Sequence, residues 1–542
     1  MKIFDAKDYG MEQNTDITVK LLELLEKFKA IDEEKILQFD KGEYFLSSKL
    51  SKKLNIYITN TIGKREWREG EIPHENKTPV YIDGISKLTI DGNDSVFFIC
   101  GQVTNAVIRS SADITLKNLE LKTVNPDIHD MTVVGKKLNY VDFKLDNEST
   151  YVKENDEFYF VGEDYKTPFT FKRVTSWWIG NVKKETPDKI VRTGNPFKLS
   201  YKIVELSKNL FRAYYFLPVS FEIGETFCLF DTRRRYAGIF IDGCKNVVFD
   251  GVKQRFNYSL AVVCQHTENL TIKNCDFSPK GEKKMASLAD FIQVCMCSGQ
   301  IVITDNYFEG AGDDCLNVHG FHFKIKNIKG NTITVSFKHP QSYGFLPLDK
   351  GDDIEFVNST TLLTEGSAKI LTSKMVNEYD IELEVDNTDN ANVGDVIEDI
   401  SKCPDLIFRN NRINRIITRG ILVTTRGKVL VENNVFNNNS MSGILISNDA
   451  VGWYESGRVE DFTIRNNTFN STDCGYDILI KPENKIHKGY VHKNILIENN
   501  IFNSNLKGGI YVKSSDNVII KDNIVKEENF KIINKNSNIT EI

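Results

Sequence analysis

The sequence predicts an all-β chain: a right-handed parallel β-helix with two inserted small β-barrel domains and an N-terminal capping helix. Three observations lead to this fold class. Short apolar strands recur about every 23 residues, as in a solenoid whose coils stack on one another. Two long segments interrupt this repeat, and removing both restores a normal coil on either side. These two segments alternate apolar and polar residues, which is typical of small antiparallel domains.

The repeat can be followed through one column of residues, three positions after an apolar residue near each strand end. The column contains Asn93, Leu119, Val252, Cys275, Asn306, Asn411, Asn434, Asn467, Asn500 and Asn523. Most intervals correspond to one coil, but 133 residues separate Leu119 from Val252, and 105 separate Asn306 from Asn411. Excising residues 128–236 and 322–401 reduces these intervals to 24 and 25, so each leaves one ordinary coil.

The resulting division has five parts. They are the N-terminal cap and first coils (1–127), a first β-barrel insertion (128–236), the coils carrying the candidate site (237–321), a second β-barrel insertion (322–401) and the C-terminal coils (402–542). The one clear helix runs from Asp16 to Ala30, with Asp16 as a capping residue ahead of apolar residues at helical spacing. It is expected to cover the open apolar end of the solenoid.

Composition narrows the function. The chain has 542 residues, 40% of them hydrophobic, and 69 basic against 75 acidic residues give a net charge of −6. It has no polybasic stripe for nucleic acid and no run of transmembrane length. The first ten residues lack an apolar signal core, as in a mature exported chain or a protein that stays inside the cell.

The ten cysteines occur singly, several of them at strand positions, such as Cys244, Cys264, Cys275, Cys295 and Cys315. Buried stacked thiols explain them better than disulfides or a metal site, since no metal-ligand spacing is present. Cys295 and Cys297 share one strand and do not form a zinc motif. No cofactor or metal is expected.

The most informative motif combines Asp290, at the start of one strand, with Asp313-Asp314, at the start of the next. Asp290 and Asp314 are 24 residues apart, so the coil period makes them neighbours on adjacent coils, about 4.8 Å apart. An aspartate at a strand start is often only a turn residue, as Asp477 could be. Three aspartates on two adjacent coils favour a site instead.

Acetal hydrolysis with inversion needs a carboxylic acid and a carboxylate base about 6.5–9.5 Å apart, with the nucleophilic water between the base and the sugar. Asp290 and Asp314 could share that water as the base. Asp313 points elsewhere and could be kept protonated by its acidic neighbours, which makes it the expected acid.

Neighbouring strands supply candidate sugar-binding groups. Arg, Asn, Asp and His side chains can hydrogen-bond vicinal hydroxyls, and Trp453 can pack under the apolar face of a sugar ring. Each has a structural alternative: Arg426 could pair with Asp449 across coils, and Trp453 could pack on a loop. The candidates are Asn317, His319, Arg419, Thr425, Arg426, Asn448, Asp449, Trp453 and Glu455. The asparagine column from Asn306 to Asn523 is instead expected to form a side-chain ladder that satisfies turn backbone.

Together, the Asp290 strand, GAGDDCLNVHG (310–320), TRGILVTTR (418–426) and SNDAVGWYESG (447–457) resemble glycoside hydrolase family 110, the bacterial exo-acting α-1,3-galactosidases. The resemblance implies a right-handed β-helix with inserted β-barrels and an inverting hydrolase that uses three aspartates, matched here by Asp290, Asp313 and Asp314. The implied substrate is an oligosaccharide or glycoconjugate with terminal α-galactose, of B-antigen type or linear, and the sequence also allows a homodimer.

Other functions remain open. Family 28 polygalacturonases also combine one Asp with a following Asp-Asp pair, but their Gly-His-Gly and Arg-Ile-Lys motifs are missing here. A calcium-dependent pectate lyase would need a metal and a basic residue as its base. A non-catalytic glycan-binding β-helix would need no aspartate triad.

Overall fold

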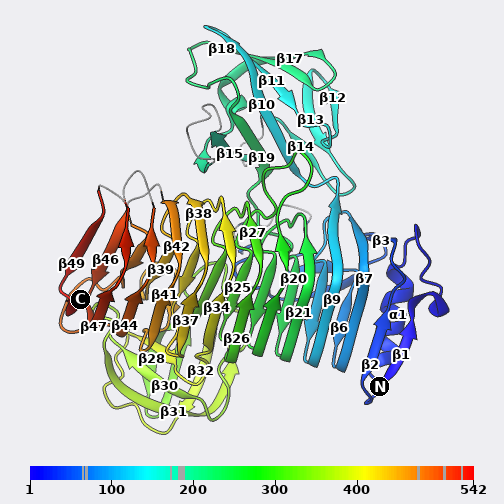
Figure 1. Cartoon of the computed structure of the whole chain (residues 1–542). Coiled ribbons are helices and arrows are strands. Elements are labelled where there is room, and N and C mark those ends of the chain that lie inside the picture. Colours follow the sequence, from blue (N-terminus) through cyan, green and yellow to red (C-terminus); the bar gives the residue numbers. More distant parts are fainter. Residues whose placement is uncertain are drawn as a thin grey trace.

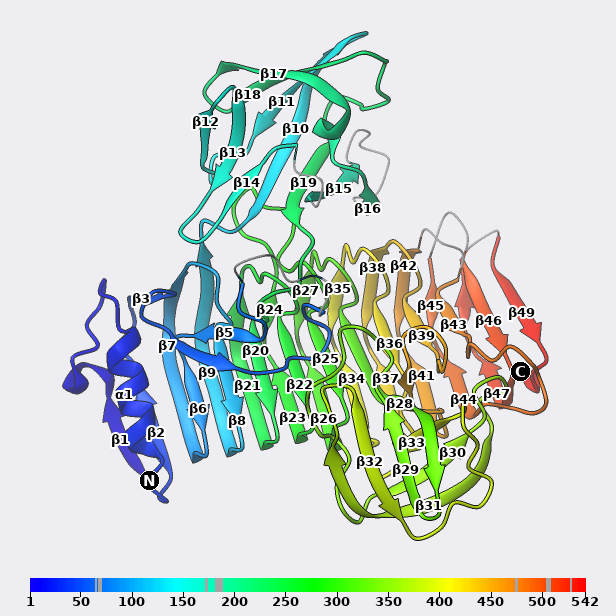
Figure 2. The same ribbon diagram turned by 180° about the vertical axis from the view of Figure 1, so that it is seen from behind.

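The computed structural model describes residues 1–63, 66, 71–170, 174–180, 189–472, 476–503, 508–526 and 529–542. Its body is a long solenoid of stacked parallel strands with one domain on each side (Figures 1 and 2). The all-β fold class with a parallel β-helix is therefore confirmed. In the described residues, no helix is long and apolar enough to cross a membrane.

Parallel strands run the length of the solenoid in a first sheet, which consists of two ladders joined through its longest strands, and in a second stack. The first sheet contains β1 (Lys2–Asp5), β2 (Lys35–Gln38), β3 (Glu43–Ser47), β7 (Ser86–Cys100), β9 (Ala112–Val124), β21 (Lys245–Gln254), β23 (Glu268–Lys273), β24 (Asp276–Phe277), β26 (Ser298–Thr304), β27 (Tyr307–Glu309), β34 (Asp405–Arg409), β35 (Arg412–Asn414), β37 (Val429–Glu432), β38 (Val435–Asn439), β41 (Phe462–Arg465), β42 (Thr468–Thr472), β44 (His492–Glu498), β45 (Ile501–Phe502), β47 (Ser515–Lys521), β48 (Ile524–Val525) and β50 (Ile539–Glu541).

The second stack provides the wall on which the candidate aspartates lie. It contains β6 (Tyr81–Asp83), β8 (Ala106–Arg109), β20 (Ile239–Asp242), β22 (Val262–Gln265), β25 (Ile292–Cys295), β28 (Leu316–Lys329), β36 (Ile421–Val423), β39 (Ile444–Ile446), β43 (Ile478–Ile480), β46 (Gly509–Lys513) and β49 (Lys531–Lys535). A short antiparallel hairpin, β4 (Lys52–Asn55) with β5 (Glu75–Thr78), precedes it in the chain.

The core between the stacks is built from repeated columns of like residues. Phe436, Phe469 and Phe502 stack with ring centroids 5.0 and 5.1 Å apart. Beside them, the predicted asparagine ladder is confirmed. From Asn306 to Asn523, each amide donates to the side-chain oxygen of the next asparagine, over 2.9–3.2 Å. Each of these oxygens also accepts a backbone N–H, so the ladder satisfies buried turn backbone.

The first residue of the predicted column was wrong. Leu119, Val252 and Cys275 do lie in register, but Ser95, not Asn93, pairs with Leu119. The strand β7 has a register shift between Asp91 and Ser95, which moves the column by two residues.

The N-terminal helix α1 (Thr18–Phe28) covers the end of the solenoid (Figure 1). Asp16 accepts hydrogen bonds from the Thr18 backbone at 3.0 Å and from its hydroxyl at 2.6 Å, so it binds the first residue of the helix, but the N-cap position itself is Ile17 and not Asp16. Leu21, Leu25 and Phe28 are buried in the solenoid core.

The chain leaves the solenoid after β9 and returns with β20. The strands between them are β10 (Ile128–Lys137), β11 (Tyr140–Leu145), β12 (Tyr151–Glu154), β13 (Glu157–Val161), β14 (Lys166–Pro168), β15 (Val174–Gly180), β16 (Lys189–Thr193), β17 (Ser200–Ser207), β18 (Leu210–Tyr215) and β19 (Thr226–Asp231). Seven of them form one antiparallel sheet, and β12–β14 form a second. Among the described strands no pairing joins the outer strands β16 and β17. Instead, Phe158 and Phe160 of the smaller sheet fill the core against Phe143 and Phe211.

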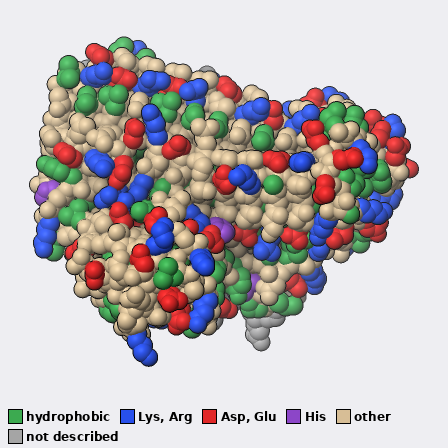
Figure 3. Space-filling view, turned by 90° about the horizontal axis from the view of Figure 1, so that it is seen from below, with side chains coloured by type: hydrophobic (Ala, Val, Ile, Leu, Met, Phe, Trp, Pro, Cys, Tyr) green, Lys and Arg blue, Asp and Glu red, His purple; other side chains and the backbone are tan. Residues whose placement is uncertain are grey.

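The second insertion is a closed antiparallel barrel. The strand β28 continues from the solenoid directly into it, followed by β29 (Thr332–Ser336), β30 (Asp353–Val357), β31 (Thr364–Met375), β32 (Asp380–Val385) and β33 (Val396–Asp399). Each strand pairs with two others, and β33 pairs with both β28 and β30, which completes the six-stranded ring. This barrel lies against the C-terminal half of the solenoid, and acidic and basic side chains alternate over the face seen in Figure 3. In the described residues all nine cysteines are free, and seven are buried.

Candidate active site

Asp290 and Asp314 lie at equivalent positions on adjacent coils. Each comes two residues before a strand of the second stack, and Ile292 of β25 pairs with Leu316 of β28. The backbone N–H of Phe291 donates to the carbonyl of Asp314 at 3.0 Å, which fixes the two aspartate positions side by side. Asp313 comes one residue earlier, so the two coils bring three carboxyl groups together.

The Asp314 carboxylate is held by the following coil. Its Oδ2 accepts a bond from the Arg419 guanidinium at 2.6 Å, and its Oδ1 accepts the Arg419 backbone N–H at 3.1 Å. The hydroxyl of Thr418 also donates to Oδ1. Burial raises the pKa of Asp314 to about 6, with Arg419 opposing the shift and Asp313 adding to it.

Asp313 has a different environment. The Arg234 guanidinium forms an ion pair with Oδ2, and Thr418 donates to Oδ1 at 3.2 Å. Burial alone would raise the pKa of Asp313, but the positive charges of Arg234 and Arg419 outweigh it and hold this pKa below its ordinary value. Asp313 is therefore the carboxylate most strongly held in the ionised form.

Asp290 is the carboxyl group on which protonation is most favoured. It is only 3% exposed, and in the described parts of the chain no side-chain hydrogen bond to it is found. Burial, with the negative charges of Asp313 and Asp314 added to it, raises the pKa of Asp290 well above its ordinary value. In the free site, the environment thus favours a proton on Asp290 and disfavours one on Asp313.

The three aspartates line a cleft of about 880 Å³. Its walls come from the return segment after β19, the second barrel, and five successive coils. The lining includes Asn60, Phe230, Thr232, Arg234, Leu288, Asn317, Gln341, Thr418, Arg419, Leu422, Met441, Leu445, Ser447, Asp449, Val451, Trp453, Glu455, Glu483 and Lys485. This volume lies in the range of sites that enclose small organic ligands.

Five of the predicted binding residues line this cleft: Asn317, Arg419, Asp449, Trp453 and Glu455. Asn317 donates to Glu455 at 3.1 Å, while its own carbonyl oxygen is buried without a partner, which leaves an acceptor for a ligand hydroxyl. Trp453 is 53% exposed and its ring stacks on His339 of the second barrel at 4.7 Å. The Asp449 carboxylate accepts backbone N–H groups of Val451, Gly452 and Trp453, so it shapes the loop that carries the tryptophan.

His319 and Asn448 do not line the cleft. His319 is buried, its Nδ1 donates to the Gly320 carbonyl at 2.8 Å, and its Nε2 accepts from Gln293 at 3.1 Å. Both ring nitrogens are therefore used within the protein. Asn448 is 1% exposed, and its backbone carbonyl accepts the N–H of Glu483.

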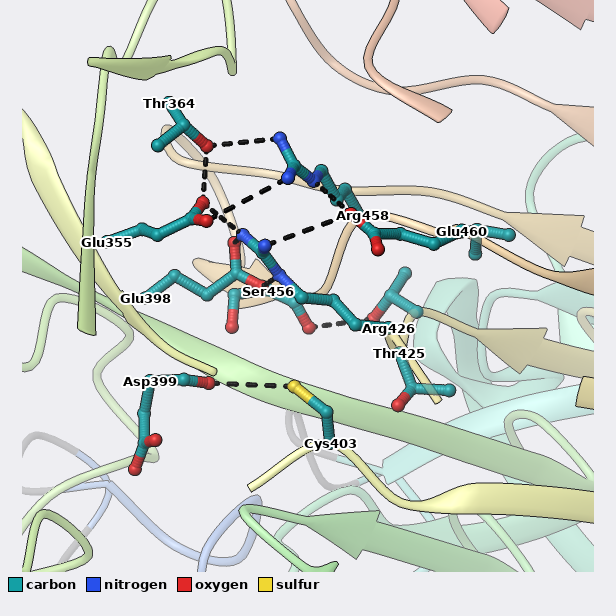
Figure 4. A network of polar contacts seen from close by, with 12 residues as sticks. Glu355, Thr364, Glu398, Asp399, Cys403, Thr425, Arg426, Ser456, Arg458 and Glu460 are labelled. Atoms are coloured by element: carbon teal, nitrogen blue, oxygen red, sulfur yellow. Dashed lines mark hydrogen bonds and ion pairs between the residues drawn. The ribbon is translucent and has the colours of Figure 1, made fainter. Parts of the chain in front are cut away.

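Thr425 and Arg426 are also outside the cleft, and their contacts are structural (Figure 4). Thr425 donates to the Pro404 carbonyl. Arg426 binds Glu398 of the second barrel at 2.8 and 2.9 Å and Glu355 at 2.6 Å, rather than Asp449. The register prediction placed Arg426 next to Asp449, but its side chain turns toward the barrel because the buried carboxylate of Glu398 and the partly buried one of Glu355 are available there.

Several lining residues were missed by the sequence reasoning. Arg234 lies in the return segment of the first insertion, Asn60 in the N-terminal coils, and Gln341 in the second barrel. The backbone of Asn60 donates to the Gln341 carbonyl at 2.9 Å, so two segments far apart in sequence form one wall. The run Arg233-Arg234-Arg235 was a usable signal, since such a basic run is unusual in an acidic chain.

No group of metal-ligating side chains is found among the described residues. Six acidic and three basic residues line the cleft; Arg234 pairs with Asp313 and Arg419 with Asp314, and hydroxyl and amide groups also contribute to the lining. The arrangement suits an uncharged polyhydroxyl ligand whose reacting atom is placed next to the three aspartates.

Comparison with known proteins gives two family matches. The model described as right handed beta helix region matches residues 223–361, and that described as GLAA-B beta-barrel domain II matches residues 332–397, within the second barrel. Both agree with the architecture above.

Relatives match along nearly the whole chain. Alpha-1,3-galactosidase A of Bacteroides thetaiotaomicron is 32% identical over 95% of this chain and 90% of its own length. Alpha-1,3-galactosidase B of Phocaeicola vulgatus is 26% identical over 97% of this chain and 90% of its own. Among solved structures, the A-module of an Azotobacter vinelandii mannuronan C-5 epimerase covers 99% of this chain and 100% of its own, at 10% identity and a TM-score of 0.43.

Proposed function

The chain belongs to glycoside hydrolase family 110, the bacterial α-1,3-galactosidases, and we propose that it is an exo-acting, inverting α-1,3-galactosidase. It would release terminal galactose from host-type or linear α-galactosyl glycans. The observation that carries this proposal is the set of three aspartates from two adjacent coils, Asp290 and Asp314 buried and Asp313 half-buried, at one end of a polar cleft.

Exo-action is supported by the shape of that end. On the coil before Asp290, the equivalent position is Leu260, which is fully buried and packs against Ala237 of the return segment. Arg234 of the same segment reaches Asp313. The cleft is thus closed on the N-terminal side of the aspartates, so a terminal galactose fits there and an internal sugar does not.

For the chemistry, we assign Asp290 and Asp314 as the base pair that shares the nucleophilic water, and Asp313 as the general acid. Their equivalent positions on adjacent coils allow one water to contact both Asp290 and Asp314. Asp313 comes from the preceding position, where its side chain meets Arg234, so it can approach the glycosidic oxygen from another side.

The electrostatics of the free site set a condition on this assignment. The free site favours a proton on Asp290 over one on Asp313, so the acid role requires a proton to move to Asp313 when substrate binds. The Thr418 hydroxyl lies within hydrogen-bond distance of both Asp313 and Asp314 and links these two groups, while Asp290 would exchange its proton through the water that it shares with Asp314. A glycosidic oxygen that displaces Arg234 from Asp313 would raise the pKa of that carboxyl in the complex.

Three residues are proposed to bind the galactose. The unpartnered carbonyl oxygen of Asn317 would accept from a sugar hydroxyl, and Glu455, which holds the Asn317 amide, would accept from another. Trp453, supported by His339, would present its ring to the apolar face of a sugar.

The test uses purified protein on aryl α-galactosides, an α-1,3-linked galactobiose, a B-type trisaccharide and polygalacturonate. Galactose is expected from the galactosides, and proton NMR of the fresh product should show the β-anomer first. The α-anomer first would reject inversion, and release of galacturonate would favour the polygalacturonase alternative. A protein that binds the glycans without releasing sugar, equally well with Asp314→Asn, would be a non-catalytic binder.

A further inference from the structure

The cleft extends well beyond the three aspartates, in one direction only. From the coil of Asp290, its lining continues over the coils of Asp314, Arg419 and Ser447 to the segment with Glu483 and Lys485. Lys481 donates its N–H to the Ile446 carbonyl, and Glu483 to that of Asn448, so this segment belongs to the next coil. Four coil spacings at about 4.8 Å make this span roughly 19 Å, several times the length of one pyranose ring.

The far end of the cleft is held by backbone hydrogen bonds from both sides. Besides the bond from Glu483 to Asn448, the N–H groups of Lys485 and Ile486 both donate to the Thr360 carbonyl of the second barrel, at 2.8 and 3.1 Å. This fixes the backbone while the side chains of Glu483 and Lys485 stay exposed along the cleft. The ion pair found for Glu483 in the described part of the chain is with Lys481, at 3.0 Å, and both side chains are more than 40% exposed.

From this geometry, and resting on the proposed function, we propose that Glu483 and Lys485 form an outer subsite for the leaving group. The non-reducing galactose lies at the closed end, so the rest of the glycan runs along the solenoid toward the C-terminal coils. Its second or third sugar beyond the cleaved bond reaches Glu483 and Lys485, which accept from and donate to its hydroxyls. The protein is therefore specific for chain length as well as for the terminal linkage.

The test compares kcat/KM on substrates of increasing length that share one terminal α-galactose: an aryl galactoside, a disaccharide and a linear tetrasaccharide. For the parent protein, kcat/KM should rise from the disaccharide to the tetrasaccharide. Glu483→Ala combined with Lys485→Ala should remove about tenfold from the tetrasaccharide value and leave the two short substrates unchanged.

The matched control is Lys488→Ala, which removes an exposed lysine of the same segment that does not line the cleft. It should leave all three substrates unaffected. Equal values for disaccharide and tetrasaccharide, or an equal loss on every substrate in the double variant, would overturn the outer subsite while leaving the galactosidase intact. Failure of the proposed function would differ, since no α-galactoside of any length would then be cleaved.

Discussion

Arg419 binds Asp314 twice, through its backbone N–H at 3.1 Å and its guanidinium at 2.6 Å. The two residues lie on adjacent coils, so the solenoid itself fixes this geometry. The pair leaves Asp314 with a pKa of about 6, which is the result of burial raising it and Arg419 lowering it. The base in the proposed mechanism is therefore poised near neutral pH.

Replacing Arg419 should shift the pH dependence of catalysis. In the parent protein, kcat/KM should fall below about pH 6 as the base pair is protonated. Arg419→Gln removes the positive charge that favours the carboxylate, so the pKa of Asp314 rises and the acidic limb moves to higher pH, by about 1–3 units. Arg419→Lys keeps the charge and should move it less. If the acidic limb of the pH profile does not move in Arg419→Gln, Asp314 is not the base.

The leaving group distinguishes the acid from the base. Each of the three Asp→Asn variants should lose about 10²–10⁴-fold in kcat on a disaccharide. Asp313→Asn should recover much of this loss on a dinitrophenyl galactoside, because an acidic leaving group needs little protonation. Asp290→Asn and Asp314→Asn should not recover. Recovery in Asp290→Asn instead would mean that the proton favoured on Asp290 in the free site stays there in the complex, and that Asp290 is the acid.

Much of the solenoid could be predicted because residues one coil period apart in the sequence lie next to each other on adjacent coils. The adjacency of Asp290 and Asp314 and the asparagine ladder follow from a period of about 23 residues alone. Arg234, Asn60 and Gln341 could not be found this way, since they reach the cleft from segments outside the repeat. The backbone of Arg426 lies near the position expected from the repeat. The repeat does not determine where the side chain points, and here it points to the carboxylate of Glu398.

Asp290 should destabilise the folded protein at neutral pH. Its folded pKa is raised above the unfolded value, so the folded state is most stable below the unfolded pKa and loses stability as pH rises from there to the folded pKa. Asp290→Asn removes this titration with little change in volume. Its melting temperature should exceed that of the parent by a few degrees at pH 7–8, and the difference should shrink toward pH 4. A constant difference at all pH values would point to packing rather than charge.

Arg426 should contribute to stability and not to substrate binding. Arg426 is 11% exposed on its side chain, and it pairs with Glu398 at 2% and Glu355 at 13% (Figure 4). Arg426→Met would remove the closest cation from both carboxylates, leaving His322 at 3.8 Å from the buried Glu398, and should cost about 3–5 kcal/mol of the free energy of unfolding.

The pH dependence of this loss has a definite sign. Burial alone would raise the pKa of Glu398, but Arg426 and His322 hold it well below its ordinary value, so this carboxylate contributes stability above its unfolded pKa and loses it as pH falls. The cost of Arg426→Met should therefore be largest near neutral pH and smaller in acid. Denaturant unfolding at pH 7 and pH 4 measures the cost at each pH, with Arg426→Lys as the variant that keeps the charge.

Below the melting temperature of the Arg426→Met variant, KM for an aryl galactoside should be unchanged, since Arg426 does not line the cleft. A raised KM with unaltered stability would show that Arg426 takes part in substrate binding instead.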